Sequence, residues 1–212
     1  MINICEYLLS NTKKANIIHA TNATIKQIVK DELDKLGHNA DLNHIDVSQV
    51  TNMSDLFSCG TYLGANLGKE YEDINPDISM WDVRKVKTMD SMFFRCEKFN
   101  CDLSRWETES LEDARRLFTY CKEFNKDISN WYVGKVYDMR EMFYGCENFN
   151  KDISSWDVRK VTDMTSMFRK CTKFCKNLSK WETYDNVDYS YCFSGTKMLK
   201  HKKYWPHKWP WE

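Results

Sequence analysis

Glycine and proline are scarce in this chain, and long apolar runs are missing. Its 212 residues include seven glycines and three prolines, and no Gly/Ser-rich or Pro-rich stretch divides it. We therefore expect no flexible linker between independent domains. No run approaches the roughly 18 apolar residues of a membrane span, and the first residues lack the basic start of a secretory signal. These absences predict a cytoplasmic protein, or a secreted or surface-displayed one if the chain is a processed form.

An excess of charge of either sign is also missing. Lysine plus arginine and aspartate plus glutamate each number 31, so the whole chain has no general electrostatic attraction to nucleic acid or to an anionic membrane. No phosphate-binding loop, nucleophile elbow or zinc-protease motif is present. The chain has nine cysteines, an odd number, which argues against a disulfide scaffold. No two of them form a CxxC pair, which argues against a zinc site. We expect no enzyme, no cofactor and no bound metal.

What the chain does have is a repeat of 25 residues. Three residue types keep this spacing: Trp81, Trp106, Trp131, Trp156 and Trp181; Phe93, Phe118, Phe143, Phe168 and Phe193; Cys96, Cys121, Cys146 and Cys171. A degenerate unit begins near Asp41 and has Ile45 at the tryptophan position, 36 residues before Trp81. We therefore expect about six repeats over residues 41–198, with an 11-residue insertion near 58–71.

A single unit has too few apolar residues to bury them alone, so neighbouring units should stack around a continuous core. Val161 to Met164 suits a short strand that pairs in parallel with its equivalent in the next coil, and Thr165 to Cys171 suits one short helical turn. The recurring cysteines are expected to be buried thiols. The recurring polar residues Asp77, Asp102, Asp127, Asp152 and Asn100, Asn125, Asn150 are expected to bond the turning backbone.

Both ends of such a stack need covering, because the terminal coils would otherwise expose their core. Residues 1–40 are expected to be a helical N-terminal cap, with a short helix over residues 2–9 and a second one that ends at Gly37. Thr24 and Gln27 fit a capping box for the second helix. Residues 199–212 form a basic aromatic cap or tail. As a tail it could contact nucleic acid through Lys202, Lys203, Tyr204, Trp205, Lys208 and Trp209.

The repeat pattern F-N-x-D-I-S-x-W-D-V-x-x-V-x-x-M-x-x-M-F-x-x-C, seen at residues 149–171, resembles the BspA-like leucine-rich repeat family, also called the mycoplasma lipoprotein repeat. The resemblance covers about residues 41–198. It implies a leucine-rich-repeat-like solenoid, a mostly bacterial occurrence, and roles in attachment or protein binding. Together with the stacking argument, it predicts a capped, right-handed solenoid with one short parallel strand and one short helical turn per coil.

Function is expected at positions that vary between repeats, because the recurring residues serve the framework. Exposed Tyr, Phe and Arg are the residue types that anchor interfaces. The predicted partner-binding residues are Phe94, Arg95, Arg115, Arg116, Tyr120, Tyr137, Arg140 and Tyr144. The predicted function is a non-catalytic protein-binding scaffold, an inhibitor or adaptor such as a mobile element or phage could encode. Two alternatives remain open: a nucleic-acid-binding protein that uses the aromatic tail, and a secreted surface adhesin.

Overall fold

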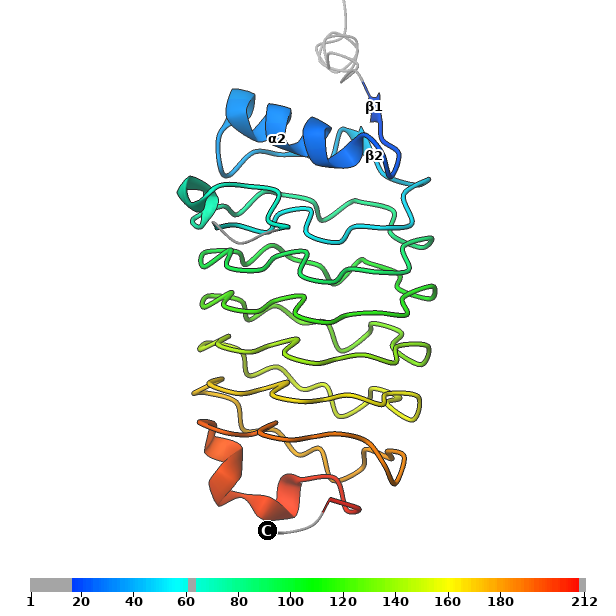
Figure 1. Ribbon diagram of the computed structural model, residues 1–212, viewed down its shortest axis with the longest axis vertical. Helices are drawn as coiled ribbons and strands as arrows, with labels where there is room; N and C mark the ends of the chain where they lie inside the picture. The colour runs from blue at the N-terminus through cyan, green and yellow to red at the C-terminus, as the bar shows by residue number, and fades with distance from the viewer. Residues whose placement is uncertain (1–16, 61–63, 210–212) are drawn as a thin grey trace, which may run out of the picture.

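A column of stacked coils makes up most of the molecule (Figure 1). The computed structural model describes residues 17–60 and 64–209, so the helix predicted over residues 2–9 lies outside it. Isolated parallel bridges join equivalent residues of successive coils, namely Asn52, Thr88, Asp113, Asp138, Asp163 and Asp188. The regular elements of the described residues lie toward the two ends: β1 (Ile18–His19), α2 (Ile25–Leu36), β2 (Ile45–Asp46), and the 3-10 helices η1 (Lys69–Tyr71), η2 (Lys197–Lys200) and η3 (Lys202–Tyr204).

The segment of each coil that was expected to be a helical turn has a different backbone. Ser166 and Lys170 adopt φ values of 56° and 62°, in the left-handed region, and so do the equivalent residues of the coils from Ser91 onward. Alternate N–H groups then point at the neighbouring coil. Ser166 and Lys170 each donate to a carbonyl of the next coil at 2.8 Å. A helix would satisfy these donors internally, whereas this backbone satisfies them between coils.

Aromatic ladders form the core of the column. The Phe93, Phe118 and Phe143 rings stack with centroid separations of 5.5 and 5.7 Å, and each packs against a second phenylalanine of its own coil at about 4 Å. The recurring tryptophans are buried, and the Nε1 of Trp131 donates to the Leu103 carbonyl at 3.1 Å. Stacking therefore buries the apolar residues and satisfies the one polar atom of each indole ring.

The polar ladders have the framework roles predicted from the repeat. Asp102 and its equivalents accept the N–H of the serine two residues on, at 2.9–3.0 Å, and Asn177 does the same in the last coil. Each asparagine of the second ladder accepts a backbone N–H from the next coil; Asn100, for example, accepts that of Asn125 at 3.0 Å. The repeating thiols are buried as predicted, and Cys146 donates to the Phe118 carbonyl at 2.9 Å.

Helix α2 lies over the first coil (Figure 1). Its Ile25, Val29 and Leu33 side chains are buried. It ends at Gly37, which has a φ of 94°. The predicted capping box does not form. Thr24 has near-helical dihedrals and its hydroxyl accepts the N–H of Thr21, while Gln27 donates to Asp31 inside the helix. The helix start is held instead by backbone bonds to the turn that precedes it.

The insertion near 58–71 braces this helix. The Tyr71 hydroxyl donates to Asp34, and the Asn66 side chain donates to the Lys26 carbonyl at 3.4 Å. At the other end of the column, η2, η3 and residues 205–209 lie over the last coil. Trp209 is 2% exposed and stacks on Tyr189 with a centroid separation of 4.3 Å.

Candidate interaction surface

The segments with left-handed residues lie one above another and form one face of the column. We call residues 88–95, 113–120, 138–145, 163–170 and 188–195 the turn segments. Each donates alternate backbone N–H groups to the next, as in the bonds from Met139, Glu141 and Phe143 to the coil that follows. Because adjacent turn segments are bonded along their length, side chains that point outward from them are held in fixed register.

Aromatic and cationic side chains from all five turn segments meet on this face. The aromatic row, as we name it, consists of Phe94, Arg95, Tyr120, Tyr144, Arg169, Lys170 and Tyr191. The Tyr120 ring meets Phe94 edge to face at 6.4 Å and Tyr144 at 5.0 Å. Arg95 lies 5.8 Å from the Tyr120 ring, and Arg169 lies between Tyr144 and Tyr191 at 5.8 and 5.4 Å. These distances are those of cation–π contacts, so the cations and rings order one another.

Tyr120 and Tyr144 are also joined through their hydroxyl groups. Burial, together with the hydrogen bond to Tyr144, raises the pKa of Tyr120 to about 12. That hydrogen bond lowers the pKa of Tyr144, and a hydrogen bond from Lys170 lowers it further. Gly145 leaves the space that the Tyr120 ring occupies, since a Cβ at residue 145 would lie 2.6 Å from Tyr120 Cδ1. The centre of the row is therefore a closely packed, polarised pair of tyrosines.

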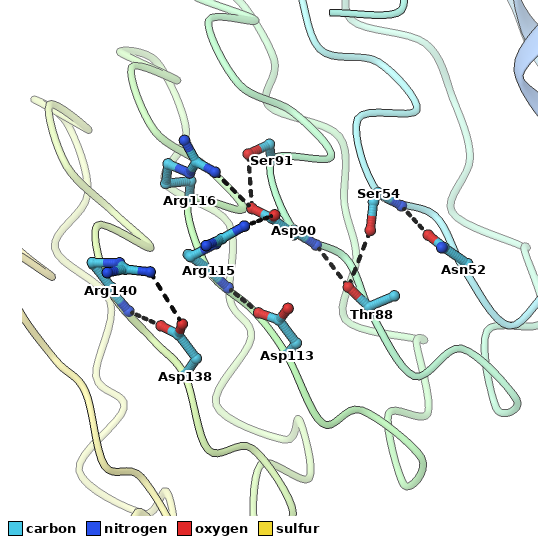
Figure 2. Close-up of polar contacts among 10 residues, drawn as sticks. All are labelled: Asn52, Ser54, Thr88, Asp90, Ser91, Asp113, Arg115, Arg116, Asp138 and Arg140. Atoms are coloured by element: carbon cyan, nitrogen blue, oxygen red, sulfur yellow. Dashed lines mark hydrogen bonds and ion pairs between the residues drawn. The ribbon is translucent and has the colours of Figure 1, made fainter. Parts of the chain in front are cut away.

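Charged side chains occupy the opposite end of the same turn segments (Figure 2). The carboxylate ladder comprises Asp90, Asp113, Asp138 and Asp163. Asp90 pairs with Arg115 and with Arg116, the latter at 3.6 Å, and Arg140 lies 3.6 Å from Asp138 and 3.7 Å from Asp163. Asp113 and Asp138 accept the N–H groups of Arg115 and Arg140. Burial nevertheless raises the pKa of both carboxyls above the ordinary value.

The predicted partner-binding residues thus fall into two groups. Phe94, Arg95, Tyr120 and Tyr144 come together in the aromatic row. The three arginines, Arg115, Arg116 and Arg140, are half-buried and engaged with the carboxylate ladder. Tyr137 is 50% exposed and lies beside Asp113 and Asp138, away from the row's contacts.

The aromatic tail, the alternative nucleic-acid contact, is largely engaged with the column. Trp205 packs on Phe193 at 5.0 Å and donates from Nε1 to the Met198 carbonyl, and the Tyr204 carbonyl accepts the Leu178 N–H. Trp209 is buried. Of the basic residues, Lys208 pairs with Asp185 at 2.9 Å and Lys203 lies over the Tyr204 ring, while Lys202 is half-buried. The Trp205 and Trp209 rings therefore pack over the last coil.

Sequence reasoning missed two features of this face. Tyr191 is 68% exposed and ends the aromatic row, yet it lies in the decaying last repeat. Tyr191 occupies the same repeat position as Arg116, Glu141 and Ser166, at steps of 25, and this shared position was the signal that could have identified it. The second feature is a pocket of about 270 Å³ between the last coil and the C-terminal cap, which we call the terminal pocket. It depends on how η2 and η3 fold back, which no repeat pattern indicates.

Over residues 17–60 and 64–209, no group of three or more His, Cys, Asp or Glu side chains is arranged to hold a metal ion. In the same ranges, no helix has the length and apolar character needed to cross a membrane.

The fold and this face define a repeat protein of stacked coils with a surface that continues from coil to coil. A family model described as "Mycoplasma protein of unknown function, DUF285" matches residues 25–139 and 102–209, which together extend from α2 into the C-terminal cap. The chain belongs to this family. No curated protein and no solved structure matches it.

Proposed function

We propose that this protein is a non-catalytic binding protein, with coils of the BspA-like leucine-rich repeat type, whose aromatic row docks onto another protein. The observation that carries the proposal is the continuity of the row. Tyrosine, arginine and phenylalanine side chains from five coils touch one another in sequence. Tyrosine and arginine are enriched among residues that contribute most to protein interfaces.

The row is already ordered before any partner arrives. Its backbone is held by hydrogen bonds between coils, and its rings and cations are held by one another. Association costs free energy for each side chain that must be immobilised, so a preformed surface binds at a lower entropic cost. Such a surface suits an inhibitor or adaptor that acts by occupying its partner.

The row is favoured over the other predicted residues on the basis of their contacts. Arg115 and Arg140 have carboxylate partners within the protein, and breaking these pairs to bind another molecule would offset much of the gain. Arg169 and Lys170 contact rings, and no carboxylate of the described residues pairs with either.

The test is a pull-down from the native cell with three baits. The first is the unchanged protein, and the second carries Tyr120→Ala and Tyr144→Ala in the row. The third is a matched control with Tyr132→Ala and Tyr184→Ala, two exposed tyrosines outside the row. We expect the first and third baits to recover the same protein and the second to lose it, with all three melting cooperatively. Equal recovery by all three baits contradicts docking through the row.

A further inference from the structure

The terminal pocket has the lining of a site for an apolar side chain. Six residues form most of its wall: Tyr189, Tyr191, Phe193, Leu199, Trp205 and Trp209. Tyr191 and Leu199 are 68% and 46% exposed, so they form the rim, whereas Phe193 and Trp209 are buried. Apolar cavities of about 150 Å³ accommodate a benzene ring, and this pocket of about 270 Å³ is open to solvent at its rim. One bulky apolar side chain fits it.

The pocket and the aromatic row are continuous through Tyr191. This residue lines the pocket and also receives the Arg169 guanidinium over its ring at 5.4 Å. Lys170, the next residue in the same coil, lies 5.5 Å from the Tyr144 ring of the preceding coil. A ligand that leaves the pocket along the row therefore meets two cations at once.

These two cations are available to an anionic ligand. No carboxylate of residues 17–60 and 64–209 forms an ion pair with Arg169 or Lys170, although many exposed lysines and arginines elsewhere are paired. At the far end of the row, Arg95 forms an ion pair with Glu72 at 3.8 Å. The positive charge of the row is thus greatest beside the pocket.

We propose that the terminal pocket and the adjoining part of the row bind an extended acidic segment of a partner protein, with one bulky apolar side chain in the pocket and carboxylates on Arg169 and Lys170. This inference rests on the proposed function and specifies its partner. Successive phenylalanine rings in this part of the column are 5.5–5.9 Å apart. An extended chain advances about 3.3 Å per residue, so an acidic residue about two positions from the apolar one reaches the cations.

A peptide fits this surface better than a single-stranded nucleic acid does. A nucleic acid carries a phosphate at every nucleotide, and the Glu141 carboxylate lies near Tyr120 in the row, where it would repel a phosphate. A peptide can place carboxylates only where cations lie. The pocket rim also leads to buried apolar rings, which favour an aliphatic or aromatic side chain.

The test is selection of binders from a displayed random-peptide library on the intact protein. We expect the enriched peptides to share a bulky apolar residue with Asp or Glu about two positions away. The affinity of a labelled selected peptide, measured by fluorescence anisotropy, should fall by about tenfold with Lys170→Glu or Tyr191→Ala, the loss typical of an interface anchor. The matched controls Lys160→Glu and Tyr184→Ala, both exposed and outside the row, should retain it.

Four results would overturn the inference. One is the absence of enriched peptides, and another is a selected peptide that binds the Lys170→Glu and Tyr191→Ala variants as tightly as the unchanged protein. The third is an oligothymidylate that binds more tightly than the peptides at physiological salt and is lost with Lys170→Glu. If the enriched peptides lack acidic residues but still require Tyr191, the acidic-segment inference fails while protein docking on the row stands.

Discussion

At the scale of single residues, the 25-residue repeat predicts which equivalent residues stack on one another. It does not predict contacts between residues whose separation differs from 25. The Asp102 and Asn100 ladders repeat without change, so their framework roles follow from the sequence. Asp90 and Arg115 are also in register, and writing the repeats one above another would have indicated their ion pair. The contact of Arg116 with the same carboxylate is off register by one residue. It depends on the side-chain directions that the left-handed backbone sets.

Gly145 and Gly195 allow a matched test of the tyrosine pair. Both have a positive φ, of 73° and 78°, at equivalent positions. A Cβ on Gly195 meets Lys170 at an ordinary 3.5 Å, whereas one on Gly145 would be 2.6 Å from Tyr120. Each alanine should cost about 1–2 kcal/mol for the left-handed backbone, and Gly145→Ala should cost more because Tyr120 must move. Denaturant unfolding measures the difference. Equal costs would contradict the close packing of Tyr120 on Gly145.

Two aspartates of one bridge ladder should respond to pH with opposite signs. Burial holds the folded-state pKa of Asp113 above 3.8. The stabilisation that protonated Asp113 contributes to the folded protein is therefore lost as pH rises through that pKa. The bond from the Ser190 N–H holds the pKa of Asp188 below 3.8, so its contribution is lost as pH falls through that value. At neutral pH, Asp113→Asn should therefore stabilise and Asp188→Asn destabilise. Asn52 already accepts a turn N–H in this ladder, so the amide fits.

Urea unfolding of the two asparagine variants, at neutral pH and near pH 4, checks this prediction. The Asp113→Asn difference should shrink near pH 4, where the Asp113 carboxyl approaches protonation, whereas the Asp188→Asn difference should largely persist, because the pKa of Asp188 lies below 3.8. A destabilised Asp113→Asn variant at neutral pH would show that the ionised carboxylate is favourable in the folded protein.

At the scale of elements, the second helix predicted in residues 1–40 is α2, and its predicted end at Gly37 is confirmed. The capping box was wrong because a side-chain motif is only one of several ways to satisfy the first N–H groups. The helical turn expected in each coil was also not found. Apolar residues three and four apart suit a helix, but they also suit a turn segment whose donors are bonded by the next coil. Spacing within one repeat does not distinguish the two.

The attachment of α2 to the insertion gives a prediction for this element. Tyr71→Phe removes the hydroxyl that donates to Asp34, while the ring remains packed. We expect a loss of about 1 kcal/mol, since Asp34 is half-exposed. Hydrogen exchange should accelerate in α2 and stay unchanged in the coils from 113 onward. Tyr132→Phe is the control, and unchanged exchange in α2 would show that the hydroxyl does not brace the helix.

At the scale of the whole molecule, the column depends on its ends, because each coil contacts only its neighbours. The N-terminal end is covered by a helix braced by the insertion. The C-terminal end is covered by tail rings on Tyr189 and Phe193. The tail composition alone was compatible with a cap or with base stacking, and only the tertiary structure shows that the Trp205 and Trp209 rings pack on the column.

Removal of the largest cap residue should destabilise the column from its C-terminal end. Trp209→Ala deletes a side chain that is 2% exposed, packs against the Tyr189 and Phe193 rings and donates to Thr183. The expected cost is about 3–5 kcal/mol, with faster hydrogen exchange in residues 178–198 before any change near α2. Lys203→Ala, in the same tail but exposed, should have little effect. Uniform acceleration along the column would contradict unfolding from the end.

The sequence by itself determined the repeat, its length and the framework role of its recurring residues, because identical residues at a constant interval must share one environment. It also located helix α2. Only the tertiary structure decided which exposed residues form a surface. Tyr120, Tyr144 and Tyr191 differ in repeat position, and their rings and the cations between them meet because left-handed residues turn the backbone and bring neighbouring coils within bonding distance. These contacts between rings and cations arise only when coils stack, so they cannot be inferred from a single repeat.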